Sequence, residues 1–291
     1  MELRQLRYLV ALAEERSFTR AAGKVLVAQP ALSQQIAKLE AEVGLPLVDR
    51  TTRRVAMTEA GDRLVEHARR VLKQVDVARE DLADLAGLRG GRLTIGASQT
   101  VGALNLSGLL AEFYRRHPAV DLSVREDLSV NLARALQADE LDLAFVTLAE
   151  NRAEGLELEV LSREELVAVL PEDHPLAGRA NLRVADLDGE AIVTFRQGAR
   201  IRHRLVEAAA RAGFEPRIAF ETNEVARMRA LVAAGLAIAV LPRSDAEQPG
   251  PAAATVPFDE PEFRHVVYMA TRAGRHHSPA ARAFMELTRA A

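Results

Sequence analysis

The chain has 291 residues, of which 48% are hydrophobic and 27% are charged. This length predicts about two domains, and the composition is that of a globular protein, which excludes a disordered or fibrous chain. The chain has no cysteine, so disulfides, thiolate catalysis, Cys-ligated zinc and thiol redox sensing are excluded. It shows neither an apolar run of about 18 residues nor a signal peptide, and we expect a cytoplasmic protein.

The net charge of −3 is divided unevenly along the chain. Residues 1–90 carry 15 Lys and Arg against 13 Asp and Glu, whereas residues 91–291 carry 23 against 28. The basic excess at the front is small, but Arg50, Arg53 and Arg54 lie close together there. Such a cluster is typical of a nucleic-acid contact.

Three short helices are predicted at the start of the chain, over residues 2–15, 18–26 and 30–43. The first is predicted from four apolar residues at helical spacing, which are Leu3, Leu6, Val10 and Ala13. The third has a similar apolar stripe, which consists of Leu32, Ile36, Leu39 and Val43. Gly44 and Pro46 end this third helix.

The face of the third helix opposite its apolar stripe is polar and almost free of acidic charge. It carries Pro30, Ser33, Gln34, Ala37 and Lys38. A short helix, a tight turn and a second helix with such a face form a helix-turn-helix, whose second member enters the major groove. There, Gln can read adenine, and Lys can contact guanine or phosphate. On the helices alone, any small helical domain with a solvated polar face is an equally good interpretation.

Residues 48–58 favour the DNA-binding interpretation. In this segment Val55 is predicted to face inward and Arg54 and Ala56 outward, around a turn at Thr51-Thr52. This pattern predicts a β-wing tipped with arginines. Such a wing can contact phosphates or enter the minor groove.

A long helix without proline is predicted from Thr58 to about Leu88. Its apolar residues recur in steps of four and three, an a/d heptad pattern formed by Leu64, Ala68, Val71, Val75, Ala78, Leu82 and Leu85. We expect a dimerising coiled coil rather than a helix packed on its own domain, because the apolar seam is narrow. A dimer would also place two recognition helices on the half-sites of a palindrome. Gly90-Gly91 is the expected hinge to the next domain.

Beyond residue 91, strand-like and helical segments alternate in two cycles. The first consists of 92–97, 103–116, 120–124, 130–138 and 141–146. The second consists of strands at 165–170, 191–195, 217–221 and 237–242 with helices at 201–212 and 224–234, and a strand near 264–270 and a helix from Ser278-Pro279 follow. This alternation predicts two α/β units with parallel strands and a ligand between them.

Polar residues follow several of these strands, where such a ligand cleft would lie. They are Ser98-Gln99-Thr100, Ser129, Thr147, Thr194 to Gly198 with Arg200, and Asn223. Hydroxyl groups and helix N-terminal amides can hold a carboxylate, and Arg196 and Arg200 favour an anion. Each Ser or Thr taken alone is more often a helix N-cap, and the arginines could equally be surface charges.

No common enzyme motif is present, since GxxxxGK[ST], HExxH, GxSxG and GxGxxG are all missing. His276-His277 lacks both ligand spacing and nearby carboxylates. We therefore expect no enzyme, no catalytic residue, no cofactor and no metal site. Two alternatives stay open: a small-molecule-binding protein or enzyme whose first ninety residues serve only oligomerisation, and an architectural DNA binder with a vestigial cleft.

Several blocks of the sequence together resemble the LysR-type transcriptional regulators over essentially the whole chain. MELRQLRYLVALAEERSFTRAA, VAQPALSQQIAKLEAEVGLPL and DRTTRRVAMTEAG resemble that family's winged helix-turn-helix, and LPEDHPLA and AGLAIAVLP resemble segments of its effector domain. The resemblance implies a sequence-specific DNA-binding regulator that forms a homodimer or homotetramer on a palindrome-like promoter site. It also implies a small-molecule effector, and RNA polymerase is a further partner to consider. The lack of cysteine excludes a resemblance to the family's thiol-based peroxide sensors.

The resemblance further implies the domains and the site residues. The domains are a winged helix-turn-helix at 1–58, with the helix-turn-helix at about 18–37, a linker helix at 59–89, and a periplasmic-binding-protein-like α/β effector domain at 90–291. The effector domain comprises subdomain 1 at about 90–161 plus 266–291 and subdomain 2 at about 162–265, with crossings near 161–163 and 263–266. The implied DNA-facing residues are Gln29, Pro30, Ser33, Gln34, Lys38, Arg50, Arg53 and Arg54. The implied effector-binding residues are Ser98, Gln99, Thr100, Ser129, Thr147, Arg196, Gln197 and Asn223.

Overall fold

The computed structural model describes residues 1–49, 55–85, 90–101, 104–148, 153–261 and 263–291, without the side chains of residues 80, 81 and 83–85. The described residues form two compact units. One unit, called the DNA-binding unit after its expected role, consists of Met1–Gly90 with two short segments, Ala138–Glu140 and His276–Pro279. The other, called the effector unit after its expected role, consists of Gly91–Gln137, Leu141–Arg275 and Ala280–Ala291. Each unit contains its own hydrophobic core.

The DNA-binding unit has the helices and the wing strands that the sequence predicts. Its elements are α1 (Leu3–Glu15), α2 (Phe18–Lys24), α3 (Gln29–Val43), β1 (Val48–Asp49), β2 (Ala56–Met57) and α4 (Glu59–Leu85). The prediction for α2 was two residues too long, because Val25 already leaves helical geometry as the C-cap. The antiparallel pairing of β1 with β2 confirms the base of the predicted wing. The wing arginines Arg50, Arg53 and Arg54 lie outside the described residues.

The core of this unit is wider on α1 than the predicted stripe. Leu6, Leu9 and Leu12 are buried, whereas Leu3 is 40% exposed. The reason is that α1 packs against α2, α3 and α4, so more than one side of the helix is covered. On α3 the predicted stripe is confirmed at Leu32, Ile36 and Leu39, which are fully buried, and is wrong at Val43 in the last turn, which is 40% exposed. Burial of these apolar side chains fixes which face of α3 is left for solvent.

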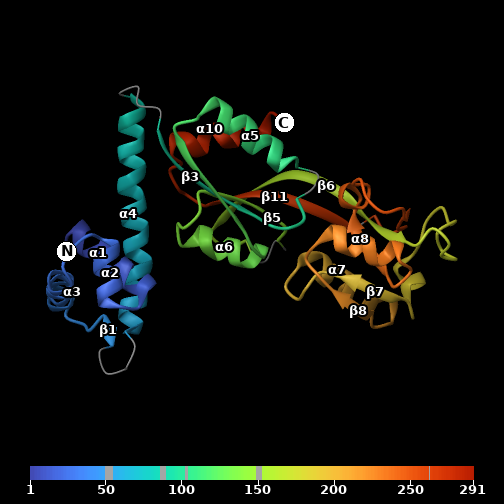
Figure 1. Ribbon diagram of the computed structural model, residues 1–291, viewed down its shortest axis with the longest axis horizontal. Helices are drawn as coiled ribbons and strands as arrows, with labels where there is room; N and C mark the ends of the chain where they lie inside the picture. The colour runs from blue at the N-terminus through green and yellow to red at the C-terminus, as the bar shows by residue number, and fades with distance from the viewer. Residues whose placement is uncertain (50–54, 86–89, 102–103, 149–152, 262) are drawn as a thin grey trace. The chain divides into compact units, whose positions relative to one another are not determined.

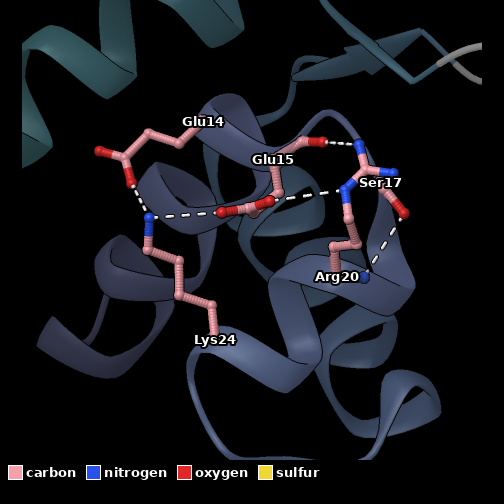
Figure 2. A network of polar contacts seen from close by, with 5 residues as sticks. All are labelled: Glu14, Glu15, Ser17, Arg20 and Lys24. Carbon is pink, nitrogen blue, oxygen red and sulfur yellow. Dashed lines mark hydrogen bonds and ion pairs between the residues drawn. The ribbon is translucent and has the colours of Figure 1, made fainter.

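A polar network links the end of α1 to α2 (Figure 2). The ammonium of Lys24 lies 2.8 Å from a carboxylate oxygen of Glu14 and 3.4 Å from one of Glu15. The hydrogen bond to Glu14 and the Glu14 charge raise the pKa of Lys24. Arg20 donates to the Glu15 carbonyl, and Ser17 caps α2 by accepting from the Arg20 N–H at 3.4 Å. These contacts are solvent-exposed, so they orient the helix pair more than they stabilise it.

The apolar seam of the long helix α4 is buried within its own unit at the start of the helix and exposed further along. Its first turns pack on their own unit, where Val65 and Ala68 are buried and Leu64 is partly buried. Further along, Val71 is 42% exposed and Leu82 is 66% exposed, although Val77 between them, which is not a seam position, is buried. A helix packed on its own domain therefore describes the start of α4, while later seam positions are uncovered in the single chain.

Nine strands of the described effector unit form one mixed sheet. They are β3 (Gly91–Ala97), β4 (Val120–Glu126), β5 (Leu143–Val146), β6 (Leu156–Leu170), β7 (Ala191–Thr194), β8 (Arg217–Glu221), β9 (Ile238–Pro242), β10 (Ala254–Pro257) and β11 (Arg264–Arg272). Their order is β4-β3-β5-β11-β6-β9-β7-β8, and β10 pairs with β6. Strands β3, β4 and β5 pair in parallel, as do β7, β8 and β9, which confirms the two predicted parallel units.

Helices cover both faces of the first half of this sheet (Figure 1). The helices of the unit are α5 (Leu106–Arg116), α6 (Ser129–Gln137), α7 (Arg200–Ala212), α8 (Val225–Ala233), α9 (Arg243–Ala246) and α10 (Pro279–Arg289), with a 3-10 helix at Val184–Leu187. α5 and α10 pack into one core with Leu93 and Ile95, and α6 packs into a separate core with Ala144 and Val146. The second half has its own core, to which α7 and α8 contribute.

Two long strands connect the halves. Strand β6 pairs with β11 along residues 156–165 and then with β9 and β10 along residues 166–170. The prediction of a strand at 165–170 was therefore too short. The missed part is 156–164, and its first five residues, LELEV, alternate apolar and acidic residues, which is a strand pattern. Strand β10 and the short helix α9 were not predicted, since both are too brief for a periodic signal.

The turn before α3 has two unfavourable local features. Leu26 has a φ of 56° and is 91% exposed, although a left-handed conformation is costly for a residue with a Cβ. Ala28 is the N-cap of α3 and has no side chain that can accept a hydrogen bond. The start of α3 is therefore less stable than a capped helix.

We predict that Ala28→Ser stabilises the DNA-binding unit by about 0.5–1 kcal/mol, because a Ser hydroxyl at an N-cap accepts from a first-turn N–H. Urea denaturation of the full chain would measure this gain in the transition of that unit. The control is Ala37→Ser in the interior of the same helix, where Ser is a weaker helix former than Ala and should slightly lower stability. Equal effects of the two variants would contradict the capping argument.

A buried ion pair joins strands β3 and β5 to the end of β11. The guanidinium of Arg275 and the carboxylate of Asp142 are 2.7 Å apart, and both side chains are 1% exposed. Arg275 also donates to the Leu141 carbonyl at 2.7 Å, and Asp142 accepts from the Thr94 N–H at 2.8 Å. Removal of one partner would leave a charge buried without compensation.

We predict that Arg275→Met lowers the free energy of unfolding of the effector unit by about 3–5 kcal/mol. The matched control is Arg92→Met, which removes the exposed pair with Asp121 at 3.2 Å and should cost at most about 1 kcal/mol. Denaturant titration of both variants measures the difference. A double variant, Arg275→Met with Asp142→Leu, should recover part of the loss, and a double variant less stable than Arg275→Met would contradict the burial argument.

Candidate functional site

The outward face of α3 is the candidate DNA-contacting surface. Gln29, Pro30, Gln34 and Lys38 are exposed, and Ser33 is partly exposed. Their polar side chains make no hydrogen bond or ion pair with another described residue, so their donors and acceptors are available. The nearest acidic groups of the helix are held elsewhere, because Glu40 binds the wing and Glu42 pairs with the N-terminal ammonium.

The wing is anchored to α3 and α4 by side-chain contacts. A Glu40 carboxylate oxygen accepts from the N–H groups of Leu47 at 2.9 Å and Val48 at 3.2 Å. Thr58, before α4, donates its hydroxyl to the Pro46 carbonyl at 2.7 Å and accepts from the Gly61 N–H at 3.0 Å. A Cβ on Gly61 would lie 2.1 Å from the Leu47 carbonyl oxygen, so this close approach requires glycine. The wing base is therefore rigidly placed beside α3.

Five of the eight predicted effector residues lie around one small cavity between the two halves of the effector unit. They are Ser98, Gln99, Thr100, Ser129 and Thr147. Ser98-Gln99-Thr100 follows β3, Ser129 begins α6, and Thr147 follows β5. From the other half, the cavity is lined by Phe195 after β7 and by Gly198, Ala199, Arg200 and Ile201 at the start of α7. The N-termini of α6 and α7 thus face the same space, where their dipoles favour negative charge.

The cavity wall contains a buried hydroxyl without a partner among the described atoms. Ser129 and Thr147 satisfy each other, since the Ser129 Oγ accepts from the Thr147 N–H at 3.0 Å and lies 3.3 Å from the Thr147 hydroxyl. The Ser98 Oγ is buried and has no hydrogen-bond partner among the described atoms. A buried hydroxyl in this state is destabilising unless a ligand or water meets it. Ser98 is therefore the side chain of the cavity with the strongest need for a hydrogen bond from a ligand or water.

Charge in the cavity wall is largely compensated inside the protein. Asp127 accepts from the Leu128 N–H and the Asn131 amide, both at 2.8 Å, and the Asn131 hydrogen bond is the main reason that the pKa of Asp127 is lowered. An Arg200 guanidinium nitrogen lies 3.0 Å from His203 Nδ1 and 3.5 Å from Glu207. The helix N-termini and the Ser98 hydroxyl are thus the main groups that the cavity offers to a ligand.

The cavity measures about 20 Å³, which is room for about one water molecule. Binding sites for organic ligands are commonly about 300–1,000 Å³. A larger effector therefore requires the two halves to separate. The halves approach closely at Gly198, whose φ is +93° and where an added Cβ would lie 3.0 Å from Leu128.

Three predicted effector residues do not line the cavity. Arg196 and Gln197 are exposed, and the Asn223 side chain accepts from the Arg196 backbone N–H at 3.2 Å. Sequence reasoning missed Asp127 and Leu128, which precede α6, and the apolar Ile201 in α7, whereas Phe195 and Gly198 lie in the predicted junction at 194–198. The place of Asp127 and Leu128 at a strand-to-helix junction could have been predicted from the sequence. An apolar residue in a cavity wall, however, has the same sequence pattern as one in a hydrophobic core.

No group of three or more His, Asp or Glu side chains suited to a metal ion occurs in the described part of the chain. Among the described helices, none combines the length and apolar composition that a bilayer crossing requires.

Comparisons with known proteins identify both units. Residues 3–62 match the model of the bacterial regulatory helix-turn-helix protein, lysR family, and residues 86–291 match the LysR substrate binding domain. The chain is 34% identical to the DNA-binding transcriptional dual regulator OxyR of Escherichia coli, over 94% of this chain and 90% of that one. It is 36% identical to the regulator BudR of Raoultella terrigena, over 84% of this chain and 85% of that one.

Solved structures of full-length regulators share the fold. A full-length variant of OxyR from Pseudomonas aeruginosa matches with a TM-score of 0.76 at 30% identity, covering 99% of this chain and 94% of that chain. CbnR complexed with its target DNA matches with a TM-score of 0.67 at 26% identity, covering 100% and 99%.

One expectation was wrong. The lack of cysteine does not separate this chain in sequence from peroxide-responsive regulators, because a hydrogen peroxide-inducible genes activator of Dickeya chrysanthemi is 35% identical over 83% of this chain and 79% of that one. Without cysteine, however, the chain has no thiol to oxidise. The two matched domains, which together cover nearly the whole chain, show that this protein belongs to the LysR family of DNA-binding transcriptional regulators with a ligand-binding domain.

Proposed function

We propose that the chain binds a palindrome-like promoter site as a dimer and that a small anionic effector, held between the halves of the effector unit, changes how it engages that site. The observation that carries the DNA part is the outward face of α3, whose polar side chains have no partner among the described residues. DNA contacts come from Gln29, Pro30, Ser33, Gln34 and Lys38 and from the wing arginines Arg50, Arg53 and Arg54. The protein acts by binding and catalyses no reaction.

Dimerisation along α4 follows from the exposure of its seam. Val71 and Leu82 are 42% and 66% exposed, which is unusual for apolar seam residues unless another helix covers them. Two copies paired through this part of α4 would present two α3 helices to two half-sites. Assembly to a homotetramer and contact with RNA polymerase stay predictions from family membership.

The effector part rests on the convergence of two helix N-termini with the unpartnered Ser98 hydroxyl. A carboxylate or another small anion fits amides and hydroxyls of this kind. Quantitative footprinting on DNA around the protein's own gene tests both parts, with acetate, succinate and benzoate as probes. A protected palindrome-like site that one acid shifts supports the proposal. A site unaffected by every acid would contradict the anion, and the absence of any specific site would contradict the whole proposal.

We predict that replacing both Arg53 and Arg54 with Ala weakens binding to all DNA sequences and reduces the slope of log K against log salt by roughly two. The physical reason is the loss of two cations that displace counterions from phosphates. The matched control replaces two exposed arginines of the effector unit, Arg115 and Arg227, which should leave the slope unchanged. Gln34→Ala should instead reduce discrimination between bases, and an equal loss for every sequence would contradict base reading.

We predict that Gly198→Ala destabilises the effector unit by about 1–2 kcal/mol and weakens any response to an acid while DNA affinity is retained. Alanine is disfavoured at a positive φ, and its Cβ would press on Leu128 across the cavity. Urea denaturation measures the stability, with Gly178→Ala as control because no atom lies within 4 Å of its added Cβ. If the two glycine variants behave alike, the close approach at Gly198 is not a constraint.

A further inference from the structure

Two acidic side chains lie at the contact between β6 and α9, where the effector unit passes from one half to the other. Glu164 lies on β6, opposite His265 of β11, and the short helix α9 packs on the same strand. One Glu164 carboxylate oxygen accepts from the Ser244 N–H in α9 at 2.9 Å. The next residue, Asp245, is only 3% exposed. Glu164 therefore holds α9 against β6 at the residue that precedes a second, buried carboxyl group.

Three buried oxygens at this contact have no hydrogen-bond partner among the described residues. They are Oε1 of Glu164, Oγ of Ser244 and Oδ2 of Asp245. The other Asp245 oxygen accepts from the Gln248 side chain at 3.1 Å. Two ionised carboxylates are unfavourable where their buried oxygens accept no hydrogen bond. One proton would supply the missing donor and remove the repulsion between them.

The charged groups around the contact do not neutralise Asp245. On α9 itself, Arg243 binds Glu165 and Glu247, each at 2.8 Å. The other cations nearby are Arg163 and Arg264, which line the same surface hollow as Glu164, and Arg204 of α7, which donates to the Arg264 carbonyl. The buried Arg229 of α8 donates to the carbonyl of Gln248, the residue whose side chain binds Asp245. Arg264 itself donates from Nε to the Pro261 carbonyl at 2.6 Å. These arginines also make the hollow a poor site for a metal cation.

Burial, and secondly the charge of Glu164, raise the pKa of Asp245 to about 7. The nearby His265 does not compensate, because burial lowers its pKa and keeps the ring neutral. Its Nε2 is 2.7 Å from the Thr100 carbonyl, to which the neutral ring can donate. Thr100 lines the effector cavity, so the acidic contact and the cavity are connected through one buried side chain.

We propose that Glu164 and Asp245 share one proton and form a pH-sensitive switch between α9 and β6, which modulates the effector response through His265 and Thr100. In the protonated state, Asp245 donates to Glu164 and α9 stays tightly packed. Loss of the proton places two negative charges in one buried contact and loosens α9 at the crossing. The link to the effector response rests on the proposed function, whereas the proton sharing does not.

The sign of the effect follows from linkage. The pKa of Asp245 is higher in the folded chain than in the unfolded chain, so folding is favoured at low pH by this group. The stabilisation is full below the ordinary pKa of an aspartate, about 4. It decreases as the pH rises from there and is lost above about 7.

The first experiment measures urea unfolding of the full chain from pH 5 to 8. For the wild type, the unfolding equilibrium constant of the effector unit should contain a one-proton contribution, up to about tenfold per pH unit. Asp245→Asn keeps the shape but cannot ionise, so it should remove this contribution and be more stable than the wild type at pH 8. Glu164→Gln should leave a titration but move its midpoint to lower pH, because the neighbouring charge is gone. Glu172→Gln, at an exposed position, is the control and should match the wild type.

Identical pH dependence in the wild type and Asp245→Asn would overturn the proposal. So would stabilisation of the wild type by calcium or magnesium at pH 8 that Asp245→Asn lacks, because the oxygens would then be cation ligands. Glu164→Gln keeps the test decisive if Asp245→Asn does not fold, since an unmoved midpoint would exclude proton sharing.

The second experiment repeats the footprint with an acid that shifts it, at pH 6 and pH 8. A response that differs between the two pH values in the wild type but not in Asp245→Asn supports the regulatory link. A pH-independent response, in a chain that still shows the one-proton contribution to stability, would overturn that link alone. If no acid of the panel shifts the footprint, the proposed anionic effector fails, while the unfolding result still decides on the shared proton.

Discussion

Pairing between β6 and β11 is the constraint on which the effector unit depends. Each half of the sheet is built outward from this pair, with β5, β3 and β4 on one side and β9, β7 and β8 on the other. The ladder is irregular between Val267 and Tyr268, close to the crossing. Because only a few residues connect the halves, a change in their angle must be absorbed there. Thr100 lies on the cavity side of this joint and Glu164 on the α9 side, so a ligand and a proton would bias the same motion.

The DNA-binding unit, by contrast, depends on rigidity, because its hydrophobic core fixes the orientation of α3. Leu32, Ile36 and Leu39 are fully buried, and the helix cannot rotate without exposing them. The wing is fixed to this helix by Glu40 and to α4 by Thr58. Recognition surfaces gain specificity when their side chains are presented on rigid elements, since less ordering is required on binding. The outward polar residues of α3 are not needed for packing, so they are available for contacts with DNA.

Much of this fold was predictable because its signals are local. Apolar periodicity marked α3 and α4, and alternating strands and helices marked the parallel halves. Prediction failed where tertiary contacts decide. On α1 the buried face includes Leu9 and Leu12, since neighbours cover more than one side. In the cavity, hydroxyls at strand ends were predictable, but the inward position of Ile201 and the outward position of Arg196 depend on how two halves approach each other.

The absence of cysteine shows that a chain can share the fold of these regulators without the thiol groups that an oxidant could modify. Relatives named for hydrogen peroxide are about one-third identical to this chain, and the fold is shared across its whole length. Sequence identity of about one-third is enough to preserve the hydrophobic cores, the crossings between the halves and the helix α3. In the function proposed above, the sensing chemistry resides in a few side chains around the cavity and the crossing, and such side chains can change without loss of the fold. For this chain the available groups are hydroxyls, helix N-termini and carboxyls, which respond to anions and protons rather than to oxidants.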